Sequence, residues 1–305
     1  MDKAWHEARS KGIGGSDVGA VCGISPWRTP LQVWEAKRGL SAPQDDNPAM
    51  FWGRTLEPVI RQKYSDETGR TVQVPTLIIT HHEYPWMLGN LDGVTPDDRV
   101  VEIKTAGYPT GWGEPGTDQV PMPYLFQVQW YMAITGYAVA DIPVLIGGRD
   151  FRIYEVPEDA ELQAMIIERC REFWALVQSG TPPDPVNYQD VTRLYKRSEA
   201  KQIKATEEVE KAVGFLRVIS NDMKMLEERE EETKKTIMEF MQEADELVDL
   251  SGRTLATWKS AKGAWRLDTK ALKQLQPETY SQFLTESEPS RRFLLKGGDK
   301  NGRTA

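Results

Sequence analysis

Apolar and polar positions alternate in residues 99–104 with the period of a β-strand. Val101 and Ile103 fall on one face of this strand, and Glu102 and Lys104 fall on the other. Residues 86–94 read as a second strand, and Thr95-Pro96-Asp97-Asp98 supplies typical turn chemistry between the two. The pattern therefore predicts a short hairpin that projects a glutamate and a lysine together.

The same periodicities predict the other elements of the first part of the chain. Strands are expected at 72–79, 139–146 and 151–156, and helices at 29–38, 49–68, 124–135 and 157–178. Pro157 suits the first turn of the last helix, and 105–123 is a loop rich in glycine and proline. Helices interleaved with strands indicate the α/β class.

A second region follows the proline-rich segment 179–190, which reads as a linker, so domains are expected at 1–180 and 181–305. Apolar residues then recur every seven positions in an acidic helical segment, 199–248, with an interruption at Glu230 and Thr233. This pattern predicts a long helix or a helical hairpin, with a bend or turn near 229–235. It serves as an interaction arm or, alternatively, as a packed helical pair with a solvated acidic face.

The basic tail, 253–296, predicts a small α+β unit with strands around a short helix. Trp258 and Trp265 lie among its basic residues. Such tryptophans either stack on nucleobases or belong to a core, and the core is the more common place for them.

Charge and composition restrict the class of protein. The chain has 305 residues, is 39% hydrophobic and carries a formal net charge of −8. Residues 207–249 contain 14 acidic and 6 basic residues and so account for the whole excess, while 193–204 and 253–273 are locally basic and could contact a polyanion. Two cysteines are too few for a four-cysteine metal site. With no signal peptide or membrane-spanning segment recognisable, we expect a cytoplasmic protein without a membrane partner.

Folding of the hairpin would bring Asp92 opposite Glu102. Facing carboxylates repel each other unless a cation lies between them, and hard divalent ions such as Mg²⁺ prefer oxygen ligands of this kind. Lys104, on the same face, could steady an anion beside that ion. From the spacing alone, an exposed hairpin edge with scattered charges remains the simpler interpretation.

Three further stretches add candidate residues. Glu57 lies on a predicted helix beside apolar positions, and Gln127 precedes Tyr131 by one helical turn. Arg9 leads into a glycine-rich turn that ends at Ser16, a combination able to hold phosphate through side chains and backbone N–H groups. Ordinary helix capping is the alternative at Ser16 and at the following aspartate.

Taken together and in this order, these stretches resemble the YqaJ-type viral recombinases, a family that includes the phage lambda exonuclease. The resemblance spans about residues 5–136. It implies the restriction-endonuclease-like PD-(D/E)xK fold, a mixed β-sheet flanked by helices. The family's D…E-x-K motif falls on Asp92, Glu102 and Lys104, with Glu57 before it and Gln127 after it.

The resemblance also implies a phosphate pocket. Trp5, His6 and Arg9 resemble the family's W-H-x-x-R entry, in which the arginine and a following serine, here Ser16, bind a terminal 5′-phosphate. A second serine of the lambda enzyme, two positions before the motif aspartate, is replaced here by Asn90.

On this basis the site is expected to hold Mg²⁺ or Mn²⁺ through Asp92, Glu102 and the carbonyl of Ile103, with Glu57 helping to hold a second ion or its water. Lys104 would orient or deprotonate the attacking water.

The remaining candidate, Gln127, would anchor the nucleotide or the water. The expected activity is that of a metal-dependent 5′ to 3′ exonuclease on linear double-stranded DNA, leaving 3′ single strands for recombination by annealing. Two alternatives stay open: a structure-specific endonuclease with the same site, and a non-catalytic DNA-binding scaffold. Implied partners are double-stranded DNA ends, a single-strand annealing protein and further copies of the chain, arranged as a trimeric ring in a bacterial host cell.

Overall fold

The chain forms two compact units, unit 1 (Met1–Leu194) and unit 2 (Tyr195–Ala305). The computed structural model describes residues 8–41, 47–286 and 290–296, so that Trp5 and His6 of the predicted phosphate-binding entry lie outside the described residues. Within these described ranges, no helix is both long enough and apolar enough to cross a bilayer.

The main sheet of unit 1 is built around β7 (Val139–Ile146). On one side β7 pairs along its whole length with antiparallel β8 (Asp150–Pro157). On the other side it pairs in parallel with two short strands that follow each other in the chain, β5 (Arg99–Val101) and β6 (Lys104–Ala106). β4 (Gly93–Val94) pairs antiparallel with β5. The predicted strands at 139–146 and 151–156 are confirmed.

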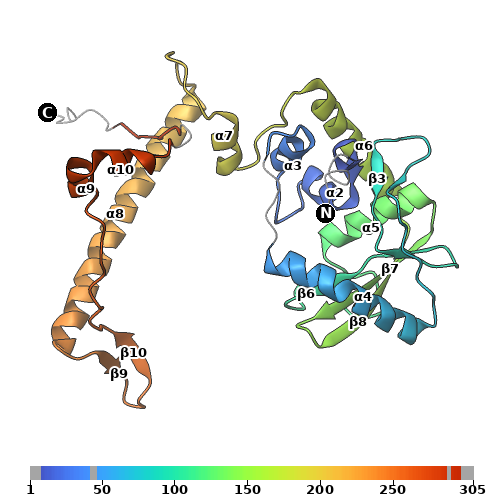
Figure 1. Ribbon diagram of the computed structural model, residues 1–305, viewed down its shortest axis with the longest axis horizontal. Helices are drawn as coiled ribbons and strands as arrows, with labels where there is room; N and C mark the ends of the chain where they lie inside the picture. Colours follow the sequence, from blue (N-terminus) through green and yellow to red (C-terminus); the bar gives the residue numbers. More distant parts are fainter. Residues whose placement is uncertain (1–7, 42–46, 287–289, 297–305) are drawn as a thin grey trace. The chain divides into compact units, whose positions relative to one another are not determined.

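Helices cover both faces of this sheet (Figure 1). α4 (Pro48–Thr68) packs Ile60 and Tyr64 against Val101, Ile103 and the outward side chains of β7 and β8.

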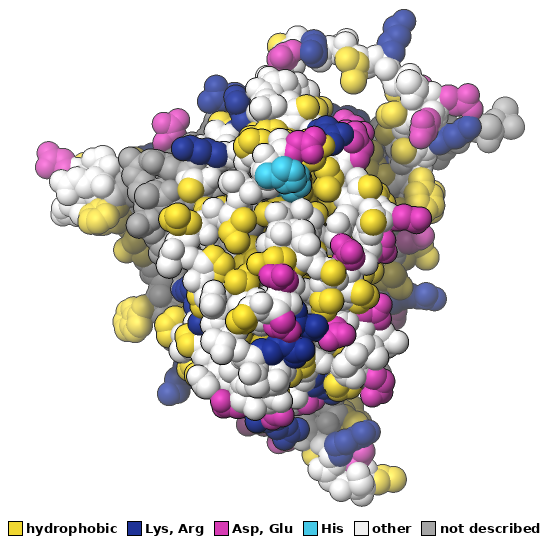
Figure 2. Space-filling model, turned by 90° about the vertical axis from the view of Figure 1, so that its right-hand side faces the viewer, with side chains coloured by type: hydrophobic (Ala, Val, Ile, Leu, Met, Phe, Trp, Pro, Cys, Tyr) yellow, Lys and Arg dark blue, Asp and Glu magenta, His cyan; other side chains and the backbone are white. Residues whose placement is uncertain are grey.

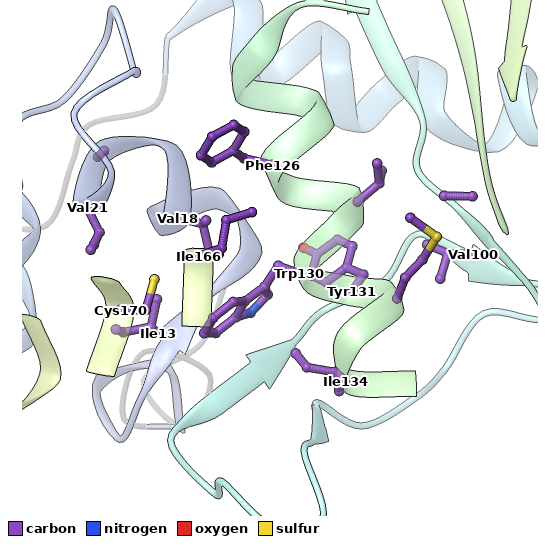
Figure 3. Packing of buried hydrophobic residues seen from close by; sticks show 14 of the residues in the cluster. Ile13, Val18, Val21, Val100, Phe126, Trp130, Tyr131, Ile134, Ile166 and Cys170 are labelled. Atoms are coloured by element: carbon purple, nitrogen blue, oxygen red, sulfur yellow. The ribbon is translucent and has the colours of Figure 1, made fainter. Parts of the chain in front are cut away.

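The opposite face contacts α5 (Met122–Thr135), and α6 (Ala160–Ser179) packs against α5. Alternate β7 residues, including Ala140 and Ile142, belong to that larger core. Figure 3 shows α5 side chains such as Trp130 pointing into it. The expected mixed sheet flanked by helices is thus confirmed.

A small second sheet carries the glycine-rich turn to the hairpin. β1 (Ile13–Gly14) pairs in parallel with β3 (Met87–Gly89), and β2 (Ile79–Thr80) pairs with β3 on its other edge. A Cβ on Gly12 would lie 2.3 Å from the Trp86 carbonyl oxygen, so this close approach requires glycine. The helix that follows, α2 (Gly15–Val21), begins directly after Gly14, which pairs with Leu88 of β3.

Two predicted strands are interrupted where the candidate site lies. The strand expected at 86–94 divides into β3 and β4 around residues 90–92, and the strand expected at 99–104 divides into β5 and β6 at 102–103. The cause at the second break is visible: the N–H of Ile103 donates to the Asp92 carboxylate at 2.8 Å, so it is not free for the ladder. The strand expected at 72–79 is wrong; only a bridge at Gln73 and β2 remain of it.

The four helices predicted for the first part of the chain are observed and differ only at their ends, whereas α2 and a short helix at Tyr188–Leu194 were not predicted. α3 (Pro30–Lys37) is capped by Thr29, whose side chain accepts the N–H of Gln32. α6 begins later than the expected residue 157, because Pro157 ends β8 and Asp159 supplies the cap.

The boundary between units lies beyond the expected residue 180, because α7 (Tyr188–Leu194) is tied to unit 1. The Thr29 hydroxyl donates to Asp190 at 2.8 Å, and Arg193 forms an ion pair with Glu35 at 3.1 Å. The proline-rich segment is therefore a connection within unit 1.

Unit 2 contains one long helix, α8 (Glu207–Met241), followed by the hairpin of β9 (Glu246–Val248) and β10 (Thr254–Thr257). The helix is continuous, so the expected bend at 229–235 and the helical hairpin are wrong. The seven-residue pattern is interrupted there by polar side chains, which a solvated helix tolerates without a break.

Two short helices, α9 (Thr269–Leu275) and α10 (Pro277–Gln282), complete the small α+β unit of the tail. They follow its two strands, whereas the sequence had suggested strands on either side of one helix. Trp258 is well exposed and Trp265 is 103% exposed, so neither forms a core.

Candidate active site

The hairpin places Asp92 across from Glu102. Gly93 pairs with Val101, and the next residue in each direction is a carboxylate. The turn closes through the N–H of Thr95, which donates to the Arg99 carbonyl at 3.0 Å. The predicted arrangement of the two carboxylates is therefore observed, and the Ile103 N–H that binds Asp92 fixes it.

Glu102 is nearly sealed from solvent, with 3% of its surface exposed. Its Oε1 accepts hydrogen bonds from Lys104 Nζ at 2.5 Å and from Gln127 Nε2 at 2.7 Å. Its Oε2 is buried and has no hydrogen-bond partner among the described residues. A buried carboxylate oxygen without a partner is costly and is therefore a natural position for a cation.

The α5 residues predicted for the site hold Glu102 in place. Gln127 accepts a hydrogen bond from Lys104 Nζ at 3.0 Å and donates to the Tyr131 hydroxyl at 3.2 Å. That hydroxyl donates in turn to the backbone carbonyl of Asn90 at 3.1 Å. One chain of hydrogen bonds thus connects the predicted motif lysine to the segment that carries the motif aspartate.

Negative charge in the site exceeds its local compensation. Burial, and then the neighbouring Asp92, raise the pKa of Glu102 to about 8. Burial also raises the pKa of Asp92, against the opposing effect of Lys104. The pKa of Lys104 is raised despite its burial, because both carboxylates favour its charged form. A divalent cation between the carboxylates would relieve this imbalance.

Glu57 stands somewhat apart from the motif carboxylates. It is half-buried on α4 and forms an ion pair with Arg61 one turn later. Burial and the charge of Asp92 raise its pKa, so the two side chains interact electrostatically. Across the described residues, no three or more His, Cys, Asp or Glu side chains converge into a ready metal cluster. The donor set is therefore a pair of carboxylates, which suits Mg²⁺, an ion that retains several waters.

The predicted phosphate-binding residues meet at the start of α2. Arg9 Nη2 donates to Ser16 Oγ at 2.7 Å. A Cβ on Gly15 would lie 2.5 Å from the Tyr131 ring, so glycine lets the turn pack directly on α5. The turn and the carboxylates are consequently held against the same helix.

Asp17 has a role that its sequence position indicated only in part. As a cap residue it accepts the N–H of Gly14 at 3.2 Å. It is also fully buried and forms ion pairs with Lys37 at 2.7 Å, Arg28 at 3.0 Å and Arg9 at 3.5 Å. Burial alone would raise the pKa of Asp17, but the three cations together hold it well below its usual range. Asp17 thereby orients the arginine predicted to bind phosphate, and no local motif signals its distant partners.

One pocket of about 120 Å³ is lined both by residues predicted to bind phosphate and by residues predicted to bind metal. Its lining includes Arg9, Ser16 and Asn90 together with Asp92, Glu102 and Gln127. Lys104 lies outside the lining but contacts two of the residues in it, Glu102 and Gln127.

On the face that Figure 2 presents, acidic, basic and hydrophobic side chains are interspersed, with no broad basic region. Attraction for an anionic ligand on that face must therefore be local.

Comparison with known proteins finds similarity both to a protein family and to individual proteins. A family model described as a YqaJ-like viral recombinase domain matches residues 4–138. The uncharacterized protein YqaJ of Bacillus subtilis (strain 168) is 29% identical over 302 residues, which cover 96% of this chain and 93% of that protein.

Similar solved structures include an alkaline exonuclease from Laribacter hongkongensis, 24% identical with a TM-score of 0.49, covering 59% of this chain and 94% of that chain. A putative exonuclease from Eubacterium rectale is 15% identical with a TM-score of 0.49, covering 67% of this chain and 96% of that chain. The match to the YqaJ-like viral recombinase domain thus covers the residues that line the pocket, from Arg9 to Tyr131, and the similarity to the Bacillus subtilis protein extends over nearly the whole chain.

Proposed function

We propose that unit 1 is a divalent-metal-dependent nuclease that degrades linear double-stranded DNA from its 5′ ends and leaves 3′ single strands for annealing. The observation that carries the proposal is the shared pocket: a candidate anion-binding turn, the buried carboxylate of Glu102 and the partly buried carboxylate of Asp92 line the same cavity. Phosphodiester hydrolysis needs a held phosphate and a stabilised developing charge at adjacent positions.

The residues present fit a Mg²⁺ or Mn²⁺ ion. Asp92, the free Oε2 of Glu102 and the carbonyl of Ile103 would hold it, and Glu57 would help to hold a second ion or its water. When bound, such an ion supplies positive charge to the phosphate oxygens and makes a coordinated water more acidic. The raised pKa of both motif carboxylates supports this choice, since a cation would restore their usual ionisation.

Lys104 acts in this proposal as a charged donor. Its raised pKa keeps the ammonium group protonated while the carboxylates are uncompensated, so it orients water or offsets charge on the phosphate. A role as general base requires that a bound cation first compensate those carboxylates. Gln127, fixed by Glu102 and Tyr131, anchors the water or the nucleotide beside it.

The proposed direction of degradation depends on the residues of the pocket that would bind the terminal phosphate. Arg9 and Ser16 grip a terminal 5′-phosphate, with Asn90 in place of the second serine of the lambda enzyme. Charge-assisted hydrogen bonds contribute roughly 1.5 to 3 kcal/mol each, so a phosphorylated end should be occupied more than tenfold better than a hydroxyl end.

The family resemblance supports two further partners. The 3′ strand would pass to a single-strand annealing protein in the cytoplasm of a bacterial host, and the chain would act as a ring-shaped homo-oligomer, a trimer by resemblance. Sedimentation of the purified chain tests the second point, and a monomer at working concentration contradicts it.

One experiment tests the chemistry. Linear duplex DNA should be degraded with Mg²⁺ or Mn²⁺ but not in excess EDTA, and Glu102→Gln, Asp92→Asn and Lys104→Ala should each abolish turnover in a folded protein. Glu228→Gln, which changes a carboxylate exposed on α8, is the matched control and should retain full activity. Cleavage by Glu102→Gln, or cleavage in EDTA, would remove the hairpin from the mechanism.

A second experiment tests the direction. Initial rates are compared on duplexes with 5′-phosphate or 5′-hydroxyl ends, with nicked and circular DNA alongside. The parent should prefer the phosphorylated linear end, and Arg9→Ala should lose most of that preference because the arginine positions the end without joining the chemical step. Equal rates on both ends, or cleavage of the circle, would favour a structure-specific endonuclease; no cleavage of any substrate would favour a DNA-binding scaffold.

A further inference from the structure

Trp27 is a large aromatic residue that is 65% exposed in the loop between α2 and α3. A single exposed aromatic side chain is ordinary, but the backbone that carries this one is held on both sides. Ser25 Oγ accepts the N–H groups of Trp27 at 3.2 Å and Arg28 at 3.3 Å, and the Arg28 side chain is anchored to buried Asp17. The loop thus presents the indole from a fixed position, as a preorganised binding residue requires.

Three aromatic rings form a ladder from the core to this surface position. Trp112 is buried and stacks on Tyr124, with centroids 5.5 Å apart and an interplanar angle of 30°. Tyr124 stacks on Trp27, with centroids 6.0 Å apart and an angle of 25°. One face of the indole is therefore supported by Tyr124, and its exposure leaves the other face to solvent.

The middle rung of the ladder touches the candidate active site. Lys104 Nζ lies 4.8 Å from the Tyr124 ring centroid and also binds Glu102 and Gln127. A phosphate held near Lys104 carries its base one sugar away. Trp27 stacks on the same Tyr124 ring that Lys104 contacts, so it is an exposed aromatic surface one ring removed from the lysine.

We propose that Trp27, supported by Tyr124, is a stacking platform for an unpaired nucleobase adjacent to the phosphate held at the candidate active site. The inference rests on the proposed nuclease function and extends it, because it names the part of the nucleotide that Trp27 recognises. Since every base has a π-face, the platform binds without sequence preference. It acts by positioning, so its loss weakens substrate binding more than it slows turnover on saturating DNA.

The test is a binding cycle between protein and DNA, measured with Mg²⁺ in the full chain carrying Glu102→Gln, so that binding is read without hydrolysis. Trp27→Ala is combined with a linear duplex that has an abasic site at each of the first few positions from the 5′ end. At one position, the abasic site and Trp27→Ala should each weaken binding at least fivefold, as expected for one lost base–aromatic stack, and together no more than either alone. Trp27→Phe should retain most of the affinity.

A direct readout accompanies the cycle. DNA with 5-iodouracil at that position should crosslink to Trp27 under long-wavelength ultraviolet light, whereas Tyr188→Ala, which removes an exposed aromatic of α7, should change neither crosslinking nor affinity. Additive losses at every position, or a crosslink elsewhere, would overturn the platform while leaving the nuclease proposal intact. A change in oligomeric state caused by Trp27→Ala without a change in DNA binding would identify a protein interface and also overturn it. If the cleavage experiments fail but the losses from Trp27→Ala and from the abasic site are still not additive, the nuclease proposal is wrong and Trp27 still binds a base.

Discussion

Strand β7 of unit 1 and helix α8 of unit 2 both carry regular apolar patterns, but only the first buries them. Ala140, Ile142 and Val144 are fully buried in unit 1. In unit 2, Met241 is the one buried hydrophobic side chain among the residues described there, whereas Met223 and Leu226 are more than half exposed. A pattern thus specifies which face is apolar, and burial depends on whether another element covers that face.

The two units also differ in how their charges are held. Unit 1 contains ion pairs removed from solvent, such as Asp17 with Lys37, whereas α8 carries exposed pairs one turn apart, such as Glu230 with Lys234. Exposed pairs of this kind contribute little individually, so α8 relies on caps, local pairs and its length. We expect substitutions in the two units to differ most where burial differs most.

The largest difference in stability between the two units should follow from substitution of charged residues. Asp17→Asn leaves Lys37 buried without an anion, and we expect it to lower the free energy of unfolding by about 3 to 5 kcal/mol. Glu228→Gln breaks an exposed pair with Lys224 and should leave stability nearly unchanged. Urea denaturation followed by tryptophan fluorescence measures both.

The same pair predicts a pH dependence. Because the folded pKa of Asp17 lies below its unfolded value of about 3.9, its contribution is present above that pH and is lost as pH falls through the folded pKa. Stability of the parent should therefore fall between about pH 5 and pH 2 more steeply than stability of Asp17→Asn. Equal slopes would show that Asp17 is not held ionised by its three partners.

A smaller difference is expected for apolar truncations. Ile142→Ala removes buried atoms from the centre of β7 and should cost about 2 to 5 kcal/mol. Leu226→Ala removes an exposed side chain from α8 and should change the free energy of unfolding by less than about 0.5 kcal/mol. If Leu226→Ala instead lowers the free energy of unfolding strongly, and more so at higher protein concentration, another chain covers α8. The exposed face of α8 would then be a property of the isolated chain only.

Much of unit 1 could be predicted because its signals are local and mutually consistent. β7, β8, α4 and α5 have long, clear periodicities, and their predicted and observed ranges nearly coincide. The pairing of Asp92 with Glu102 followed from the hairpin pattern. Convergence of the phosphate turn on the same pocket followed only from the family resemblance, because β1 reaches β3 through a long-range pairing that spacing does not encode.

Other features depended on interactions that periodicity does not report. The breaks in the motif strands arise because the Ile103 N–H binds a carboxylate in place of its neighbouring strand. The connection at 179–190 looked like a domain linker, yet Asp190 binds Thr29 across a long sequence distance. In α8, polar Glu230 and Thr233 suggested a bend, but a helix without a covering partner can place polar residues on any face.

The smallest effect on hydrolysis should follow from removal of unit 2. None of the residues in the candidate site lies beyond residue 194, and the acidic charge of 207–249 would repel DNA. A chain of residues 1–194 keeps the core of unit 1 and should cleave saturating linear duplex at nearly the parent rate per molecule. Its assembly state or its retention of a partner should change, because the exposed apolar positions of α8 are removed with unit 2. Rates are compared after circular dichroism and thermal unfolding show that the shortened chain is folded. If that folded chain no longer hydrolyses DNA, unit 2 takes part in catalysis, and its exposed residues must be counted with the site and not only with assembly.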